Sequence, residues 1–147
     1  MSEASYYLRL SGLLQRLVRV FHTQAYRYSL HQGISLSECR VLFLLRNGMP
    51  VKMNKIKHNL FVTGAFVTNI ADQLVRHKLV VRQRSDKDRR KVIITLTDKG
   101  KHYLAELAVY RRKFFKAFLD GLNKEDRRIM ERGISILVDS LESMKRI

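Results

Sequence analysis

The sequence contains few of the residues that interrupt regular structure. Its 147 residues include one proline, Pro50, and seven glycines, and no linker rich in Gly, Ser or Pro is present. Long stretches with so few breakers favour helices. A chain of this length suits one domain, and its hydrophobic content of 46% can supply a core.

Cysteine and long apolar runs are also scarce. The single cysteine, Cys39, cannot form an intrachain disulfide, which fits a reducing cytoplasm. The sequence has no apolar run of roughly 18 residues, so it predicts no membrane span. The N-terminus lacks a basic segment followed by an apolar one, so we expect a cytoplasmic protein and not a secreted one.

Acidic residues are outnumbered by basic ones. The chain has 29 Lys and Arg against 13 Asp and Glu, a net charge of +16. Residues 52–101 hold thirteen basic and four acidic residues, a net +9 and more than half of the excess. This concentration favours a polyanion such as nucleic acid, and a solvated basic face without a partner is the alternative. A membrane surface is disfavoured because the basic residues do not follow one amphipathic helix and tryptophan is absent.

The sequence lacks the clusters that carry catalysis or hold metals. Its five histidines are widely spaced, and it has no HxxxH or CxxC motif, no glycine-rich phosphate loop and no GxSxG motif. We therefore expect no metal site, no cofactor and no enzymatic activity.

The apolar residues that are present follow helical spacing in the first third of the chain. Between residues 6 and 30 they recur every three or four positions, which predicts a long amphipathic helix that ends near Gly33. Ser35 and Glu38 then form the pattern of a capping box. The helix that follows, residues 36–46, is apolar nearly all round and should lie in the core.

Two shorter helices are predicted next. Asn54 is placed to cap a helix that runs to about Leu60, and Thr63 to cap another over residues 64–77. The connecting turn, residues 61–63, has the length typical of a helix-turn-helix. We expect the second helix to turn these side chains inward: Phe66, Val67, Ile70, Leu74 and Val75.

The next segment predicts a hairpin. Residues 79–84 and 92–96 are rich in β-branched side chains and flank a polar stretch, residues 85–91. This pattern is typical of a two-stranded hairpin with a seven-residue basic loop. The expected fold is therefore mainly α with a small β-hairpin.

The helices at both ends carry apolar stripes that a small domain cannot cover. Thr97 is placed to cap a helix that runs to about residue 120, and Asn123 to cap the last helix. The stripe of the last helix consists of Met130, Ile134, Leu137, Leu141 and Met144. Pairing with the same helices of a second chain would cover these stripes in a two-fold homodimer. End helices that fold back on each other within one chain are the alternative.

Four short motifs occur in order along the chain: VTGAFVTNIADQL at residues 62–74, LV at 79–80, DRR at 88–90 and LTDKG at 96–100. As a set, they resemble the MarR family of prokaryotic winged helix-turn-helix regulators. The resemblance implies one domain over residues 1–147, with a DNA-binding lobe at about 34–100 and dimerization helices at about 5–32 and 101–147. It implies a homodimer on double-stranded DNA, associated with the nucleoid of a prokaryote. The two-fold symmetry predicts a pseudo-palindromic operator.

The second helix of the predicted helix-turn-helix begins with small or polar side chains, as a major-groove helix must. They are Thr63, Gly64, Ala65, Thr68 and Asn69. Ala65 can touch a thymine methyl, and Asn69 can pair with adenine. The alternative is that Thr63 only caps the helix and that Gly64 and Ala65 only permit close packing. The family often has a basic residue at the position of Asn69, so its base preference does not transfer.

The hairpin loop is the predicted wing. Its candidate DNA-binding residues are Arg84, Asp88, Arg89, Arg90 and Lys91. Arginine suits the narrow and strongly negative minor groove. The resemblance implies that Arg90 enters that groove and that Asp88 orients the wing, and a solvated hairpin tip is the alternative. The family's usual glycine is Lys78 here and its usual acidic residue is Ser85, which predicts local differences in both turns.

Members of the family that the chain resembles often respond to small aromatic or anionic effectors bound between the dimerization helices and the DNA-binding lobe. At this place the chain offers His22, Tyr26 and Tyr110, for which ordinary aromatic packing is an equal alternative. Peroxide-sensing relatives carry their reactive cysteine in the first helix, whereas Cys39 lies in the second. We therefore expect Cys39 to be buried and inert.

Three functions fit these observations. The leading hypothesis is a sequence-specific, dimeric regulator that binds double-stranded DNA. The alternative is an architectural, chromatin-like protein that coats DNA with little specificity, and the high charge favours it. A winged helix used for protein contacts is the third hypothesis, and failure to bind any duplex at low salt would support it.

Overall fold

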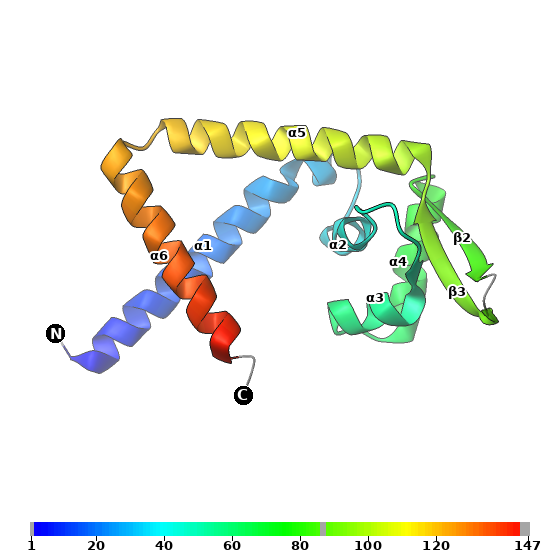
Figure 1. Cartoon of the computed structure of the whole chain (residues 1–147), viewed down its shortest axis with the longest axis horizontal. Helices are drawn as coiled ribbons and strands as arrows, with labels where there is room; N and C mark the ends of the chain where they lie inside the picture. Colours follow the sequence, from blue (N-terminus) through cyan, green and yellow to red (C-terminus); the bar gives the residue numbers. More distant parts are fainter. Residues whose placement is uncertain (1, 86–87, 145–147) are drawn as a thin grey trace. The chain divides into compact units, whose positions relative to one another are not determined.

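The structure, a computed structural model, describes residues 2–85 and 88–144. The helices in this part are α1 (Glu3–His31), α2 (Leu36–Leu44), α3 (Met53–Leu60), α4 (Gly64–Arg76), α5 (Asp98–Asp120) and α6 (Lys124–Met144). The strands are β1 (Val51–Lys52), β2 (Val80–Ser85) and β3 (Asp88–Leu96) (Figure 1). The chain divides into two compact units, Met1–Tyr110 and Arg111–Ile147. The predicted fold class, mainly α with a small hairpin, is confirmed.

Polar caps and a left-handed glycine fix the ends of the first two helices. The capping box at the start of α2 is confirmed, because Ser35 Oγ accepts the Glu38 N–H and the Glu38 carboxylate accepts the Ser35 N–H. α1 ends in a Schellman motif, in which Gly33 has a φ of +70°. There the Ile34 N–H donates to the Ser29 carbonyl at 2.8 Å. Gly33 therefore ends the first helix, as predicted.

The core of the first unit forms around α2 and α4. It includes Cys39, Val41 and Leu42 from α2 and Val67, Ile70, Ala71 and Leu74 from α4. Each of the larger side chains contributes about 1.5–3 kcal/mol by leaving water. The predicted burial of Cys39 is confirmed: its thiol is fully buried, with Sγ 3.4 Å from Ser29 Oγ.

Three predictions about α3 and α4 are wrong. Phe66 and Val75 are 42% and 40% exposed, because they flank the buried stripe of α4 and do not lie on it. Asn54 does not cap α3, because the helix begins at Met53 and the capping position is Lys52, two residues earlier than predicted. Lys52 is held there by strand pairing with Ile93 and makes no side-chain cap hydrogen bond.

The wing is a three-stranded antiparallel sheet in the order β1-β3-β2. β1 has only two residues, too few to give a periodic signal in the sequence. The predicted seven-residue loop is wrong: β3 begins at Asp88, which pairs with Ser85 after a register irregularity beyond Arg84. Pairing extends into the basic segment because it satisfies backbone N–H and C=O groups whatever the side chains are.

The LTDKG motif binds the C-terminal end of α4. Thr97 Oγ1 donates to the Lys78 carbonyl at 2.7 Å and accepts the Gly100 N–H at 3.0 Å, so it also caps α5 as predicted. The Thr97 N–H donates to the Leu79 carbonyl at 3.0 Å. These hydrogen bonds form the α4 clasp, which fixes where α4 ends and α5 begins.

Lys78 lies in the left-handed region, with a φ of +60°. α4 ends there in a second Schellman motif, because the Leu79 N–H donates to the Leu74 carbonyl and the Lys78 N–H to the Val75 carbonyl. A residue other than glycine pays roughly 1–2 kcal/mol for this conformation. The turn that was expected to differ at Lys78 thus keeps a left-handed backbone.

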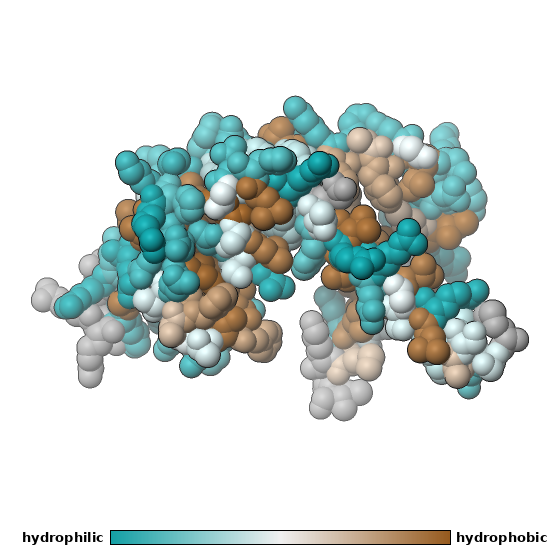
Figure 2. All heavy atoms as spheres, turned by 180° about the vertical axis from the view of Figure 1, so that it is seen from behind, coloured by the Kyte–Doolittle hydropathy of each residue, from teal (hydrophilic) through white to brown (hydrophobic). Residues whose placement is uncertain are grey.

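The long helices of each unit expose apolar side chains. In α1 the exposed residues include Tyr7, Leu8, Leu13, Leu17 and Val18, and in α6 they include Ile134, Leu141 and Met144. No residue of the described α6 is buried within the chain. Figure 2 shows hydrophobic residues at the surface among hydrophilic ones. These stripes agree with the expectation that a second chain covers them.

None of the described helices is both long enough and apolar enough to cross a membrane.

Gly100 is expected to be essential for stability, because a Cβ at this position would overlap the Leu79 carbonyl oxygen of the clasp. Gly100→Ala should lower the free energy of unfolding by about 1–3 kcal/mol through overpacking, measured by urea denaturation. Gly12→Ala in α1 is the matched control, because no described atom lies within 4 Å of its Cβ position. The control should be neutral or slightly stabilising, and equal stability of both variants would contradict the clasp.

Candidate nucleic-acid interface

The helix-turn-helix consists of α3, the turn of residues 61–63 and α4. Thr63 caps α4 as predicted, because its Oγ1 accepts the Phe66 N–H at 3.3 Å. Gly64 and Ala65, the first two residues of α4, are exposed. The positive end of the α4 dipole therefore faces solvent, where a phosphate or a base edge can reach it.

The five residues predicted on α4 lie at or near its N-terminus. Thr63, Gly64, Ala65 and Asn69 are exposed, whereas Thr68 is half-buried. The Thr68 hydroxyl donates to the Gly64 carbonyl at 3.1 Å, so its oxygen remains available only as an acceptor. Nothing lies within 4 Å of a Cβ placed on Gly64. Close packing within the described chain therefore does not explain the glycine.

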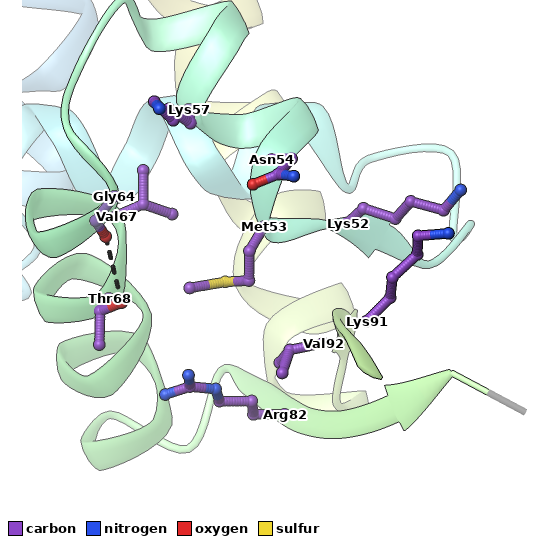
Figure 3. A pocket seen from close by; sticks show the side chains of 10 residues that line it. All are labelled: Lys52, Met53, Asn54, Lys57, Gly64, Val67, Thr68, Arg82, Lys91 and Val92. Carbon is purple, nitrogen blue, oxygen red and sulfur yellow. Dashed lines mark hydrogen bonds between the residues drawn. The ribbon is translucent and has the colours of Figure 1, made fainter. Parts of the chain in front are cut away.

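A basic cleft lies between α3, α4 and the sheet. It has a volume of about 360 Å³, and its cationic lining residues are Lys52, Lys57, Arg82 and Lys91. Figure 3 shows these four side chains around the cleft, with Met53 near its centre and Thr68 on the side formed by α4. The arrangement suits an extended anion, because the cations come from α3 and from all three strands of the wing.

One acidic residue is paired beside the cleft. Asp72 Oδ1 lies 3.1 Å from Arg82 Nη1 and ties the β2 arginine to α4. Both side chains are more than a third exposed, so the pair contributes at most about 1 kcal/mol to stability. Residues 39–71 contain no Asp or Glu and five Lys or Arg. α3 and the start of α4 therefore carry no carboxylate that would repel a phosphate.

The predicted wing residues lie on β2 and at the start of β3. Arg84 and Lys91 are exposed, and Lys91 also lines the basic cleft. The side chains of Asp88, Arg89 and Arg90 lie outside the described residues. The expected difference at Ser85 likewise concerns a side chain outside them, although its backbone pairs with Asp88.

The residues predicted from the sequence did not include Lys52, Lys57 and Arg82, which line the cleft. Each is an isolated basic residue within an element, so no local motif distinguishes it. The absence of acidic residues from residues 39–71 is the sequence signal that could have identified Lys52 and Lys57. Arg82 joins them only because β2 pairs with β3, which places Arg82 opposite Ile94.

Each of the three predicted effector residues packs against another aromatic ring. His22 packs edge-on against Tyr26, with ring centroids 5.6 Å apart. Tyr110 packs against Tyr28, with centroids 5.5 Å apart. Tyr28 was not predicted, yet its hydroxyl donates to Glu106 Oε2 at 2.8 Å.

A buried polar group connects α2 with the end of α4. Glu38 is 6% exposed, and its Oε1 lies 3.6 Å from His77 Nε2 at the C-cap of α4. Burial raises the pKa of the nearby Tyr103 phenol to about 12, although Ser29 acts in the opposite direction. Tyr103 therefore stays neutral over the physiological range. No cluster of three or more metal-binding side chains occurs among the described residues.

Comparison with known proteins identifies this arrangement. Residues 24–107 match the family model for the transcriptional regulators SarA/Rot. The HTH-type transcriptional regulator YkoM of Bacillus subtilis is 30% identical over 82% of this chain and 78% of its own length. A MarR-like transcriptional regulator of Thermotoga maritima has a TM-score of 0.70 and 26% identity, with 97% of this chain and 98% of that chain covered. FabT of Streptococcus pneumoniae, solved in complex with DNA, has a TM-score of 0.72 and 23% identity, with 97% and 99% covered.

The fold and the matches define a winged-helix transcriptional regulator of the MarR type, a class of sequence-specific proteins that bind double-stranded DNA as dimers. Within this class, the chain belongs to the SarA/Rot family of transcriptional regulators. The resemblance drawn from the four motifs is thus confirmed.

Lys57 is expected to contact a phosphate from the basic cleft. Lys57→Ala should weaken binding to all duplexes alike, because phosphates carry no sequence information. The slope of log affinity against log salt should fall by about 1 for each contact removed. Lys101→Ala is the matched control, because Lys101 pairs with Asp98 at 2.9 Å on α5. Equal salt slopes for the two variants, measured by fluorescence anisotropy, would contradict the role of the cleft.

Proposed function

We propose that this chain regulates transcription as a homodimer that places α4 in the major groove and the wing in the adjacent minor groove. The observation that carries the proposal is the exposed N-terminus of α4 beside a basic cleft, within a segment free of acidic residues. A helix of this kind, open at its positive end and flanked by cations, suits phosphate and base edges together.

Each part of the interface has a distinct task in this proposal. Lys52, Lys57 and Lys91 bind phosphates and set the register, whereas Ala65 and Asn69 read base edges. Arg90 enters the minor groove, with Arg84 and Arg89 beside it and Asp88 as a buttress for the wing. Thr63 and Gly64 offer the N-terminus of α4 to a phosphate, and Thr68 contributes an acceptor oxygen.

The protein acts by binding and not by catalysis, at the chromosomal DNA in the cytoplasm of a prokaryote. FabT, which has the same fold, was solved in complex with DNA. An aromatic or anionic effector that binds near His22, Tyr26 and Tyr110 would regulate this activity. Tyr28 belongs to that candidate site because its ring contacts Tyr110.

Selection of bound sites from random duplexes tests the proposed function. Two symmetry-related copies of α4 must reach half-sites about 10–10.5 base pairs apart. The selected sites should therefore form a pseudo-palindrome with that spacing. Sites with no dyad and no preferred spacing would support the architectural alternative.

The Asp88→Ala variant distinguishes two hypotheses for the wing. In the wing mechanism, Asp88 holds the wing in position for Arg90, whereas simple electrostatics predicts that its negative charge only repels DNA. Asp88→Ala removes a negative charge, yet it should weaken operator binding because the wing loses its buttress. Arg90→Ala, the companion variant, should cost about 1–3 kcal/mol per site and reduce the salt slope by about 1 per contact. Both affinities are measured on one selected duplex at two salt concentrations. Tighter binding by Asp88→Ala would contradict the wing mechanism.

The dimer should depend on the apolar stripe of α6. Changing Leu137 and Leu141 together to Glu buries two charges in the interface, so light scattering should report monomers that no longer bind the operator tightly. Ser135→Glu with Ser143→Glu is the control, because it adds the same charge on the opposite side of the helix. A dimer that survives the leucine changes would show that α6 is not in the interface.

A further inference from the structure

Phe61 is unusual in both its backbone and its side chain. It lies in the turn between α3 and α4, with a φ of +54° in the left-handed region. The turn needs this conformation because the Phe61 N–H donates to the His58 carbonyl and the Val62 N–H to the Lys57 carbonyl. The ring is 95% exposed, whereas its neighbours Leu60 and Val62 pack against the core.

Within the described residues, the phenyl ring of Phe61 gains almost no burial to offset its backbone conformation. A bulky residue in the left-handed region is strained, and glycine would adopt the same backbone freely. Burial of an aromatic ring normally offsets such a cost, but this ring remains in water. An observed backbone outlier of this kind is a reason to look for a function of the side chain.

We infer that Phe61 is an additional specificity-determining residue, whose ring contacts the C5-methyl group of a thymine at the edge of each half-site. The inference rests on the proposed function. Phe61 lies two residues before Thr63, the cap of α4, and is thus continuous with the proposed interface. Among the groups on the major-groove edges, the thymine methyl is the one that gains from an apolar partner.

The surrounding charge favours DNA over a protein as the partner of this ring. Phe61 lies within the segment 39–71, which has five basic residues and no acidic one. Lys57 is exposed one helical turn before it and lines the basic cleft. The apolar stripes that a second copy of the chain is expected to cover lie on long helices such as α1 and α6, and not on the turn that holds Phe61.

Phe61→Gly tests the inference because it should weaken DNA binding without lowering stability. The variant should unfold at the same or a higher temperature, because the backbone strain is relieved. Its affinity for the selected operator duplex should fall about tenfold, since each dimer loses two apolar contacts. The salt slope should not change, because no charge is removed. Lys78→Gly is the control: it relieves the same backbone strain and should keep most of the operator affinity.

Replacing each operator thymine by deoxyuridine, which lacks the methyl group, locates the contact. Wild type should lose affinity at one position in each half-site, and Phe61→Gly should be insensitive there. If Phe61→Gly binds the operator as tightly as wild type does, the inference is wrong and the proposed function still stands. The same conclusion follows if deoxyuridine weakens binding by the variant as much as by wild type. If wild type selects no sequence at all, the proposed function itself fails.

Discussion

The α4 clasp is the constraint on which the rest of the first unit depends. Thr97 binds the carbonyls of Lys78 and Leu79 at the end of α4, and the same hydroxyl caps α5. Thr97 thus joins the Schellman turn at Lys78, where α4 ends, to the start of α5. Because Gly100 lies directly against the Leu79 carbonyl, the clasp has no room for a side chain there. α4 is held at its C-terminal end, and its N-terminal end remains exposed.

The proposed DNA binding depends on this difference between the held C-terminal end and the exposed N-terminal end of α4. The buried stripe of Val67, Ile70 and Leu74 fixes the rotation of α4, so that Ala65 and Asn69 remain exposed. The sheet brings Arg82 and Lys91 beside Lys52 and Lys57 and thereby turns dispersed charges into one basic cleft. In the proposed function, a helix with an exposed N-terminus next to several cations would make base contacts for specificity and phosphate contacts for affinity.

The sequence predicts the features that local chemistry determines. The capping box at Ser35, the stop at Gly33 and the cap at Thr63 each depend on a few neighbouring residues, and all three are confirmed. Features set by partners distant in sequence were not predictable. Strand β1 exists only because it pairs with β3, and Arg82 reaches the cleft only through that sheet. Phe66 shows a third limit, because an apolar residue at the edge of a helical stripe can lie on either side of the boundary.

A regulator's basic surface must read a DNA sequence, whereas an architectural protein merely coats DNA. The most direct measurement is the ratio of affinities for the selected operator and for a scrambled duplex of the same composition, at one physiological salt concentration. A regulator should bind the operator about 10³-fold or more tightly, although both duplexes bind. Similar affinities for the two duplexes would show that the protein does not read a sequence and would identify an architectural protein.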